Sequence, residues 1–222
     1  DDEVPSVAII PFRNKGKDED VFYAYGICAD LISDCSSAGL IRVASLEKIE
    51  ELGDLELDEK AKKLDVRYIA TGTLWRMVAV FQLCIEIYDS EESKVIWSDN
   101  WQENWDNLPT IKDSLSNGLL KVLDIKPKVE KQFETTNTQA YEYFLKGMYK
   151  WHKQINEEDL EIARGFFQKA IELDDDLIGA KDLLAYTHPD FEIGLKMFES
   201  NINHAIKLDN KILLANSYIG NG

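Results

Sequence analysis

The apolar positions in the first half of the chain follow two different periods. A nearly continuous apolar run at 6–12 predicts a strand that is buried on both faces. At 21–37 the apolar residues recur at helical spacing, and at 78–88 they alternate as in a half-buried strand. The same criteria predict strands at 41–43, 66–75 and 95–101 and helices at 46–52, 57–64 and 108–123. We therefore expect an α/β fold with a mixed sheet, in the order β-α-β-α-β-β-β-α.

The second half of the chain has a helical pattern throughout. Its apolar positions predict helices at about 138–153, 158–173, 178–187 and 191–208. Ala163, Phe167 and Ala170 have the spacing of the second helix of a tetratricopeptide repeat, and Gly147 matches the small residue of the first helix. We expect an α/β domain at 1–128 and an all-α domain of helical repeats at 129–222. The second domain would hold two repeats and a truncated third that begins near 213.

The charge of the chain excludes several classes of partner. Lys and Arg number 25 and Asp and Glu number 41, so the net charge is −16. Such a chain is repelled by phosphate backbones and by anionic lipid, which argues against nucleic acid and membrane surfaces as partners. No apolar run approaches the ~18 residues of a transmembrane helix, so we expect no membrane insertion of this fragment.

Residues that carry chemistry are few and widely spaced. Cys28 and Cys35 lie about 10 Å apart along a predicted helix, too far for a disulfide. With Cys84 they indicate three buried thiols in a reducing compartment, hence a cytoplasmic location. His152 and His188 are interpreted as a helix-surface residue and a turn residue, and neither has the spacing of a metal site. Glycine-rich phosphate loops and the G-x-S-x-G motif do not occur, so we expect no catalytic residues, no cofactor and no metal ion.

One predicted helix, at 138–153, has more aromatic residues than its packing requires. Most of them are expected to lie in the core. Tyr143, Lys146 and Lys150 are the candidates for a concave groove that binds a peptide segment of a partner, because helical repeats use such surfaces for recognition. The sequence offers no other candidate site residues.

Several blocks of the first half follow one another in a fixed order. They are Ser6–Phe12, Phe22–Gly26, Leu64–Thr73, Ile87–Asp89, Ile96–Ser98 and Trp105. Together they resemble the TolB-like amino-terminal α/β domain, also called FlgO-like, over about residues 4–125. Tyr25 departs from the pattern, because the family often has an acidic residue before the glycine. The resemblance implies a bacterial domain that commonly lies between an output module and carboxy-terminal tetratricopeptide repeats. The output module is often a class III adenylate or guanylate cyclase and sometimes a winged-helix regulator.

The repeats, together with the lack of catalytic motifs, favour a regulatory function. We expect a non-catalytic protein-interaction region of a larger bacterial signalling protein, which the resemblance implies to be a nucleotide cyclase. The repeats would bind a protein partner or self-associate. The alternatives are a small-molecule sensor with a ligand near Phe12–Tyr25, a hydrolase with an unrecognised site, and a TolB- or FlgO-like protein of the periplasm or cell envelope. The chain opens without Met and stops in mid-pattern, so we expect both ends to be cut from a longer protein.

Overall fold

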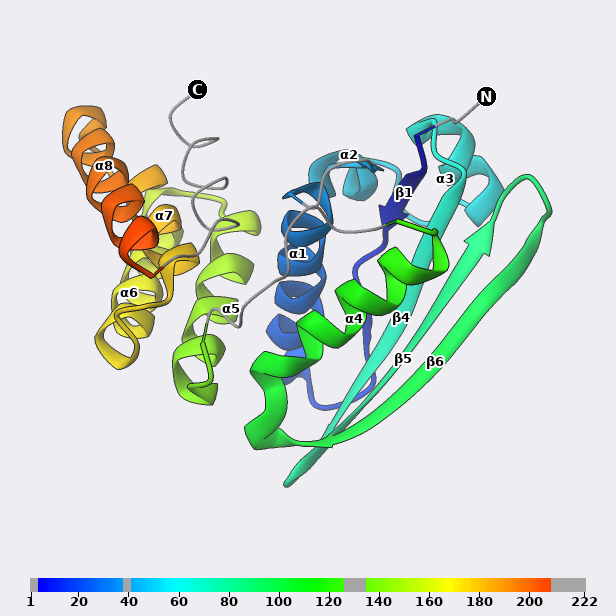
Figure 1. The fold of residues 1–222 in the computed structure, drawn as a ribbon, viewed down its shortest axis with the longest axis horizontal. Helices are drawn as coiled ribbons and strands as arrows, with labels where there is room; N and C mark the ends of the chain where they lie inside the picture. The colour runs from blue at the N-terminus through cyan, green and yellow to red at the C-terminus, as the bar shows by residue number, and fades with distance from the viewer. Residues whose placement is uncertain (1–3, 38–40, 126–134, 209–222) are drawn as a thin grey trace. The chain divides into compact units, whose positions relative to one another are not determined.

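The computed structural model describes residues 4–37, 41–125 and 135–208. The chain divides into two compact units, one made of Asp1–Trp105 with Ile111–Lys128 and the other of Asp106–Thr110 with Val129–Gly222. The first contains a sheet with helices and is named the α/β unit, and the second contains helices and is named the helical unit (Figure 1). A mixed α/β sheet accompanied by a helical part is the coarse fold that the hydrophobic pattern predicts.

The sheet of the α/β unit is mixed, as predicted. Its strands are β1 (Ser6–Ile9), β2 (Arg13–Asn14), β3 (Arg42–Val43), β4 (Tyr68–Met77), β5 (Val80–Asp89) and β6 (Lys94–Asn104). They run in the order β3-β1-β4-β5-β6, and β2 pairs with β4 beside this path. β1 is parallel to both β3 and β4, whereas β4, β5 and β6 form antiparallel hairpins.

The strand predicted at 6–12 is wrong in its extent. β1 ends at Ile9, and Pro11 has no N–H group with which to continue the ladder. Pairing resumes at β2, where Arg13 lies opposite Thr73. The segment therefore makes two short strands that pair with different parts of β4.

Helices cover the two faces of the sheet. They are η1 (Asp18–Asp20), α1 (Val21–Ser37), α2 (Leu46–Glu51), α3 (Leu57–Leu64), η2 (Trp105–Asn107) and α4 (Leu108–Val122). Figure 1 shows α1 and α4 on the same side of the sheet. On the other face, Ala8 of β1 and Ile69 of β4 pack against Ile49 of α2 and Ala61 of α3.

β5 shows that only part of the second face is covered. Its inward side chains are fully buried against the side of α1 and α4, whereas Cys84 is half-buried and Glu86 is exposed on the opposite face. The inward residues are Phe81, Leu83, Ile85 and Ile87. This period of two is the one predicted for the strand, and it leaves the face that carries Cys84 and Glu86 open next to α3.

Asp89 ends β5 and is held in a buried ion pair. Its side chain is 3% exposed and accepts hydrogen bonds from Nε and Nη2 of Arg67, the latter at 2.7 Å. The backbone N–H groups of Glu91 and Glu92 also donate to it. Burial acts to raise the pKa of Asp89, but these hydrogen bonds outweigh burial and hold the pKa below its usual value.

Acid is expected to remove the stability that Asp89 contributes. Because its pKa is lower in the folded than in the unfolded chain, the contribution is complete above about pH 4 and is lost as the pH falls through the folded pKa. The free energy of unfolding of the wild-type protein should exceed that of Asp89→Asn by about 2 kcal/mol at neutral pH, and this difference should shrink in acid. Urea titrations at several pH values measure it, and a difference that does not change with pH would contradict the account.

The helical unit, within the described residues, consists of helices joined by short turns. They are α5 (Thr138–His152), α6 (Glu157–Leu173), α7 (Ile178–Tyr186) and α8 (Phe191–Lys207). The side chains of Asn137, Asn156 and Asp190 accept N–H groups from the first turns of α5, α6 and α8, and these caps define where the helices begin. The third repeat predicted from 213 lies outside the described residues. None of the described helices combines the length and apolar character needed to cross a membrane.

Two glycines allow the helices to approach one another closely. A Cβ atom on Gly147 of α5 would lie 2.4 Å from Cε1 of Phe167 in α6. A Cβ atom on Gly194 of α8 would lie 2.7 Å from the carbonyl oxygen of Ala185 in α7. Both distances are shorter than a van der Waals contact. Gly147 therefore lies at the contact between α5 and α6, and Gly194, in the first turn of α8, lies at the contact with the end of α7.

Candidate functional site

The residues predicted for a partner groove lie on one side of α5. Nζ of Lys146 is 5.1 Å from the centre of the Tyr143 ring, within the range of a cation–π interaction. The Tyr143 ring is 6.3 Å from the ring of Phe166 in α6. The structure therefore brings Tyr143 and Lys146 together, and Lys150 follows one turn further along the helix.

Both lysines already have acidic partners within the helical unit. Nζ of Lys146 lies 2.7 Å from Oε1 of Glu142, one turn earlier in α5. Nζ of Lys150 donates to Oδ1 of Asp159 in α6, and this hydrogen bond holds the pKa of Asp159 below its usual value. Lys150 thus joins α5 to α6, whereas the ion pair of Lys146 lies within α5.

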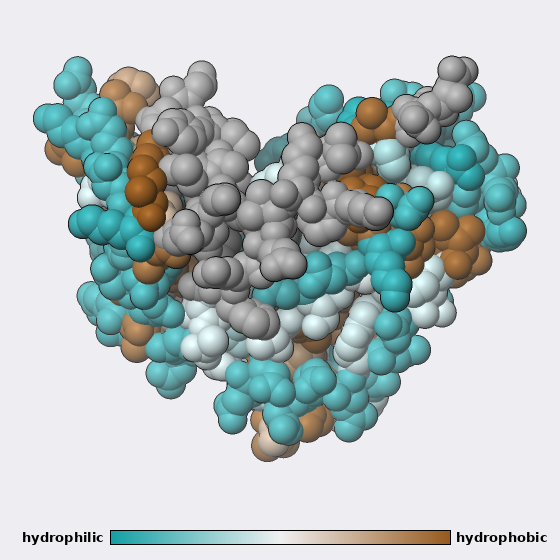
Figure 2. All heavy atoms as spheres, in the orientation of Figure 1, coloured by the Kyte–Doolittle hydropathy of each residue, from teal (hydrophilic) through white to brown (hydrophobic). Residues whose placement is uncertain are grey.

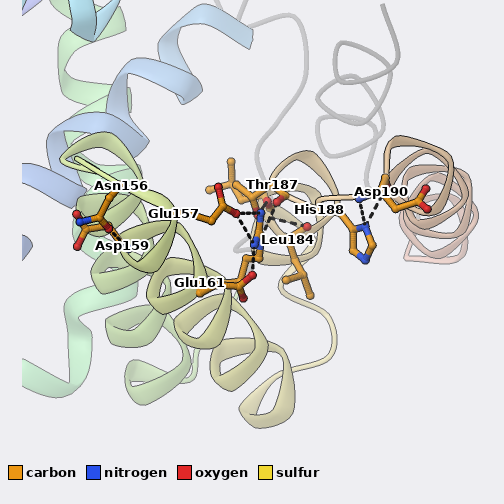
Figure 3. Close-up of polar contacts among 10 residues, drawn as sticks. Asn156, Glu157, Asp159, Glu161, Leu184, Thr187, His188 and Asp190 are labelled. Carbon is orange, nitrogen blue, oxygen red and sulfur yellow. Dashed lines mark hydrogen bonds and ion pairs between the residues drawn. The ribbon is translucent and has the colours of Figure 1, made fainter.

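Arg164 is a buried cation that the hydrophobic pattern does not reveal. Its side chain is 8% exposed, and Nη1 lies 2.5 Å from Oε1 of Glu161 and 3.4 Å from Oε1 of Glu157. Nε donates to the carbonyl oxygen of Thr187, just after α7. Figure 3 shows Glu157, Glu161 and Thr187 converging on one point between the helices. Arg164 therefore connects the end of α7 to α6. In the sequence, only the glutamate three residues before it indicates that this arginine forms an ion pair.

Arg164→Met is expected to lower the free energy of unfolding of the helical unit by about 2 kcal/mol, because the Thr187 carbonyl loses a charged donor in a buried position. Urea unfolding followed by circular dichroism measures the loss. The matched control is Lys169→Met in the same helix, whose ion pair with Glu172 is exposed and should add no measurable stability. An Arg164→Met protein as stable as this control would show that the ion cluster does not tie α7 to α6.

The histidines occupy structural positions. His188 lies in the turn before α8, where its Nδ1 accepts the N–H of Asp190 (Figure 3). Nε2 of His204 lies 3.0 Å from Oδ1 of Asp176. His152 is the last residue of α5. In the described ranges, no group of three or more His, Cys, Asp or Glu side chains could hold a metal ion.

The thiols and the segment expected to hold a sensor ligand belong largely to the core of the α/β unit. Sγ of Cys28 donates to a backbone carbonyl of β1, and burial raises the pKa of this thiol, which suppresses the nucleophilic thiolate. Cys35 is also buried, whereas Cys84 is half-buried and so departs from the core position expected for all three. Phe12 and Tyr25, which bound the expected ligand position, are both core side chains.

Apolar side chains are exposed along α8. Phe191, Leu195 and Ile206 are 80%, 38% and 54% exposed, and their spacing places them on one side of the helix. We name these three residues the α8 strip. Figure 2 shows hydrophobic residues gathered along this part of the helical unit. Phe191 and Leu195 are one turn apart, whereas Ile206 lies three turns beyond Leu195, so the strip is a row of exposed apolar side chains and not one continuous patch.

Comparison with known proteins finds similarity in solved structures. No protein-family model and no curated protein matches the chain. TolB from Acinetobacter baumannii is 15% identical with a TM-score of 0.41, and the match covers 55% of this chain and 28% of TolB. PelC from Paraburkholderia phytofirmans is 19% identical with a TM-score of 0.39, over 55% of this chain and 88% of PelC. Lipoprotein GNA1162 from Neisseria meningitidis is 15% identical with a TM-score of 0.39, over 53% of this chain and 99% of that protein.

These matches concern the fold alone. The first of them bears the name of the family that the sequence resembles, and the chain spans about a quarter of its length.

Proposed function

We propose that the chain is a non-catalytic regulatory and protein-interaction region of a larger bacterial signalling protein. It combines a TolB-like domain at 1–128 with tetratricopeptide-type repeats at 129–222, two of them and a truncated third. A nucleotide cyclase as the catalytic module of the parent protein is proposed from the sequence resemblance alone. The observation that carries the proposal is the succession of helices in which α5 packs on α6, α6 on α7 and α7 on α8, which is the packing expected of consecutive helix pairs.

The interior of the first helix pair supports the assignment to repeats. Ala163, Phe167 and Ala170 are fully buried. Phe167 lies against Gly147, and its ring is 6.3 Å from the ring of Phe144. The small residues let the helices approach, and the phenylalanine fills the space that remains between them.

Two surfaces of the helical unit are proposed to contact a protein partner or a second copy of the chain. The first is the predicted groove. There a carboxylate of the partner would replace Glu142 as the ion-pair partner of Lys146, and apolar groups of the partner would pack on Tyr143. Lys150 supports this surface by holding α6 through Asp159. The second surface is the α8 strip, because helical repeats bury such apolar faces against a neighbour.

Recovery of a partner tests this function. Tagged chains of 1–222 and of 1–128 serve as bait in extracts of cells that express the parent gene, after circular dichroism has shown that both are folded. Proteins retained by 1–222 should be lost with 1–128, and light scattering of the two chains tests self-association in the same way. Equal recovery together with equal association would contradict the role of the helical unit.

Two alternative locations of the protein are proposed, the cell envelope and the cytoplasm. One of the similar structures is named a lipoprotein, and the similar structures give no support to the cytoplasmic location expected from the thiols. Fractionation of cells that carry a tagged parent gene distinguishes the two. An envelope protein is recovered with membranes or periplasm, whereas a cytoplasmic regulator is recovered with neither.

A further inference from the structure

The open face of the sheet in the α/β unit is hollowed next to α3. A cavity of about 660 Å³ has Thr71 and Thr73 of β4 and Cys84 of β5 on its floor, and Lys60 of α3 in its wall. A second hollow of about 380 Å³ shares Thr73 and Cys84 with the first and extends along the same face to Lys15. The two hollows together are large enough for a small molecule.

Lys60 is the residue that gives this cavity its chemistry. It is 9% exposed, and in the part of the chain that the structure describes its amine has no hydrogen bond and no ion pair. The other buried cations of the described residues are partnered, Lys112 by Asp30 and Asp34 and Arg164 by glutamates. The stem of Lys60 is packed, while its amine meets solvent in the cavity. Its ammonium group therefore gives the cavity a positive charge that has no partner among the described residues, and an anion is the ligand that such a charge favours.

Further donors lie around Lys60. The side chains of Thr71 and Thr73 occupy alternate positions of β4, so both hydroxyl groups lie on the face of the sheet that forms the floor. Arg13 of β2 lines the same cavity, is exposed, and has no side-chain partner among the described residues. Hydroxyl groups and a guanidinium group are the usual donors to carboxylate and phosphate oxygens.

The cavity lies beside the carboxyl end of β1, on the face of the sheet that α2 and α3 cover. Ile10 and Pro11, which directly follow β1, line it together with the loop between α2 and α3.

The distribution of charge limits the size and charge of the ligand. Asp54, Glu56 and Glu86 also line the cavity, but all three are exposed, whereas Lys60 is buried. An anionic group is thus attracted to the ammonium group of Lys60, while the exposed carboxylates repel long polyanions. We propose that the cavity binds a small molecule through one carboxylate or phosphate group at Lys60, with Arg13, Thr71 and Thr73 as further donors. This inference does not depend on partner binding by the helical unit.

Calorimetric titration of the full chain tests the site. Sodium phosphate, sodium succinate and sodium chloride are compared at equal ionic strength, and thermal unfolding is recorded under the same conditions. Phosphate or succinate should give saturable heat and a raised melting temperature, whereas chloride should give neither. The salt that gives saturable binding identifies the anionic group, and binding of both phosphate and succinate shows that the site accepts either group. No saturable binding of phosphate or succinate at millimolar concentration would overturn the proposal.

Variants on one helix link the binding to Lys60. Lys60→Met should lower the affinity for the anion about tenfold or more, because a charged hydrogen bond is lost. Without an anion this variant should melt close to the wild type, because the amine of Lys60 has no partner to lose among the described residues. Lys62→Met, in an exposed position of α3, is the matched control and should bind normally.

A variant outside the helix covers the case in which Lys60→Met does not fold. Arg13→Gln changes an exposed side chain of β2 and should also lower the affinity for the anion. Binding that is the same in wild type, Lys60→Met and Arg13→Gln would overturn the assignment of the cavity. Equal weakening by Lys62→Met would overturn it as well, since that result would indicate a general charge effect.

Discussion

Gly147→Ala is expected to destabilise the helical unit by about 3 kcal/mol. The new Cβ atom would lie 2.4 Å from Cε1 and 2.6 Å from Cδ1 of Phe167. That ring is fully buried between α5 and α6 and touches Phe144 as well, so it has no space into which it can move. Urea unfolding followed by far-ultraviolet circular dichroism measures the effect.

A glycine on the partner helix provides the control. Gly165 of α6 has no atom within 4 Å of the position that a Cβ atom would take, so Gly165→Ala should instead stabilise the helix by up to about 1 kcal/mol through helix propensity. In a Phe167→Leu background, Gly147→Ala should cost less than in the wild type, because the two positions are in contact. A Gly147→Ala protein as stable as the wild type would show that α5 and α6 do not meet at this point.

Lys112→Met is expected to cost the α/β unit about 4 kcal/mol. Nζ of Lys112 in α4 lies 3.5 Å from a carboxylate oxygen of Asp30 and 3.6 Å from one of Asp34, both in α1. The three side chains are each less than a tenth exposed. Removing the lysine leaves two carboxylates one helical turn apart in a buried position without their cation. Urea unfolding followed by tryptophan fluorescence measures the loss.

Two further variants separate the ion cluster from the packing of α4. Lys121→Met, in an exposed position of the same helix, should leave the stability unchanged. Replacing both carboxylates by amides in the Lys112→Met protein should recover part of the loss, because no buried charge then remains. If Lys112→Met alone were as stable as Lys121→Met, the buried cluster would not stabilise the contact between α1 and α4.

Local features of the fold are largely predictable from the sequence. The helix at 57–64 has the predicted bounds, because its apolar residues have helical spacing and Asp65 ends it in the left-handed conformation. β5 follows the predicted alternation for the same kind of reason. The strand predicted at 6–12 is too long, since the apolar run continues through Pro11 although the pairing does not.

The contacts that define the candidate sites depend on distant parts of the chain and were not predictable. Helical spacing places Lys60 on the face of α3 that carries Leu57 and Leu64, but only the fold shows that it lines a cavity. Arg164 looks like a surface residue until the end of α7 is placed beside it. In the predicted groove, Tyr143 and Lys146 are neighbours because helical spacing makes them so, whereas the ion pair between Lys150 and Asp159 depends on the turn between two helices.

The central claim, that the helical unit binds a protein partner through its predicted groove, is tested most directly by the bound fraction of a recovered partner. The fraction is measured for the wild type, for Tyr143→Ala with Lys146→Ala, and for Lys62→Ala on α3 of the α/β unit as a control in an exposed position. We expect the groove variant to lose about tenfold or more of the binding while the control retains it. Equal binding by all three proteins would contradict the claim.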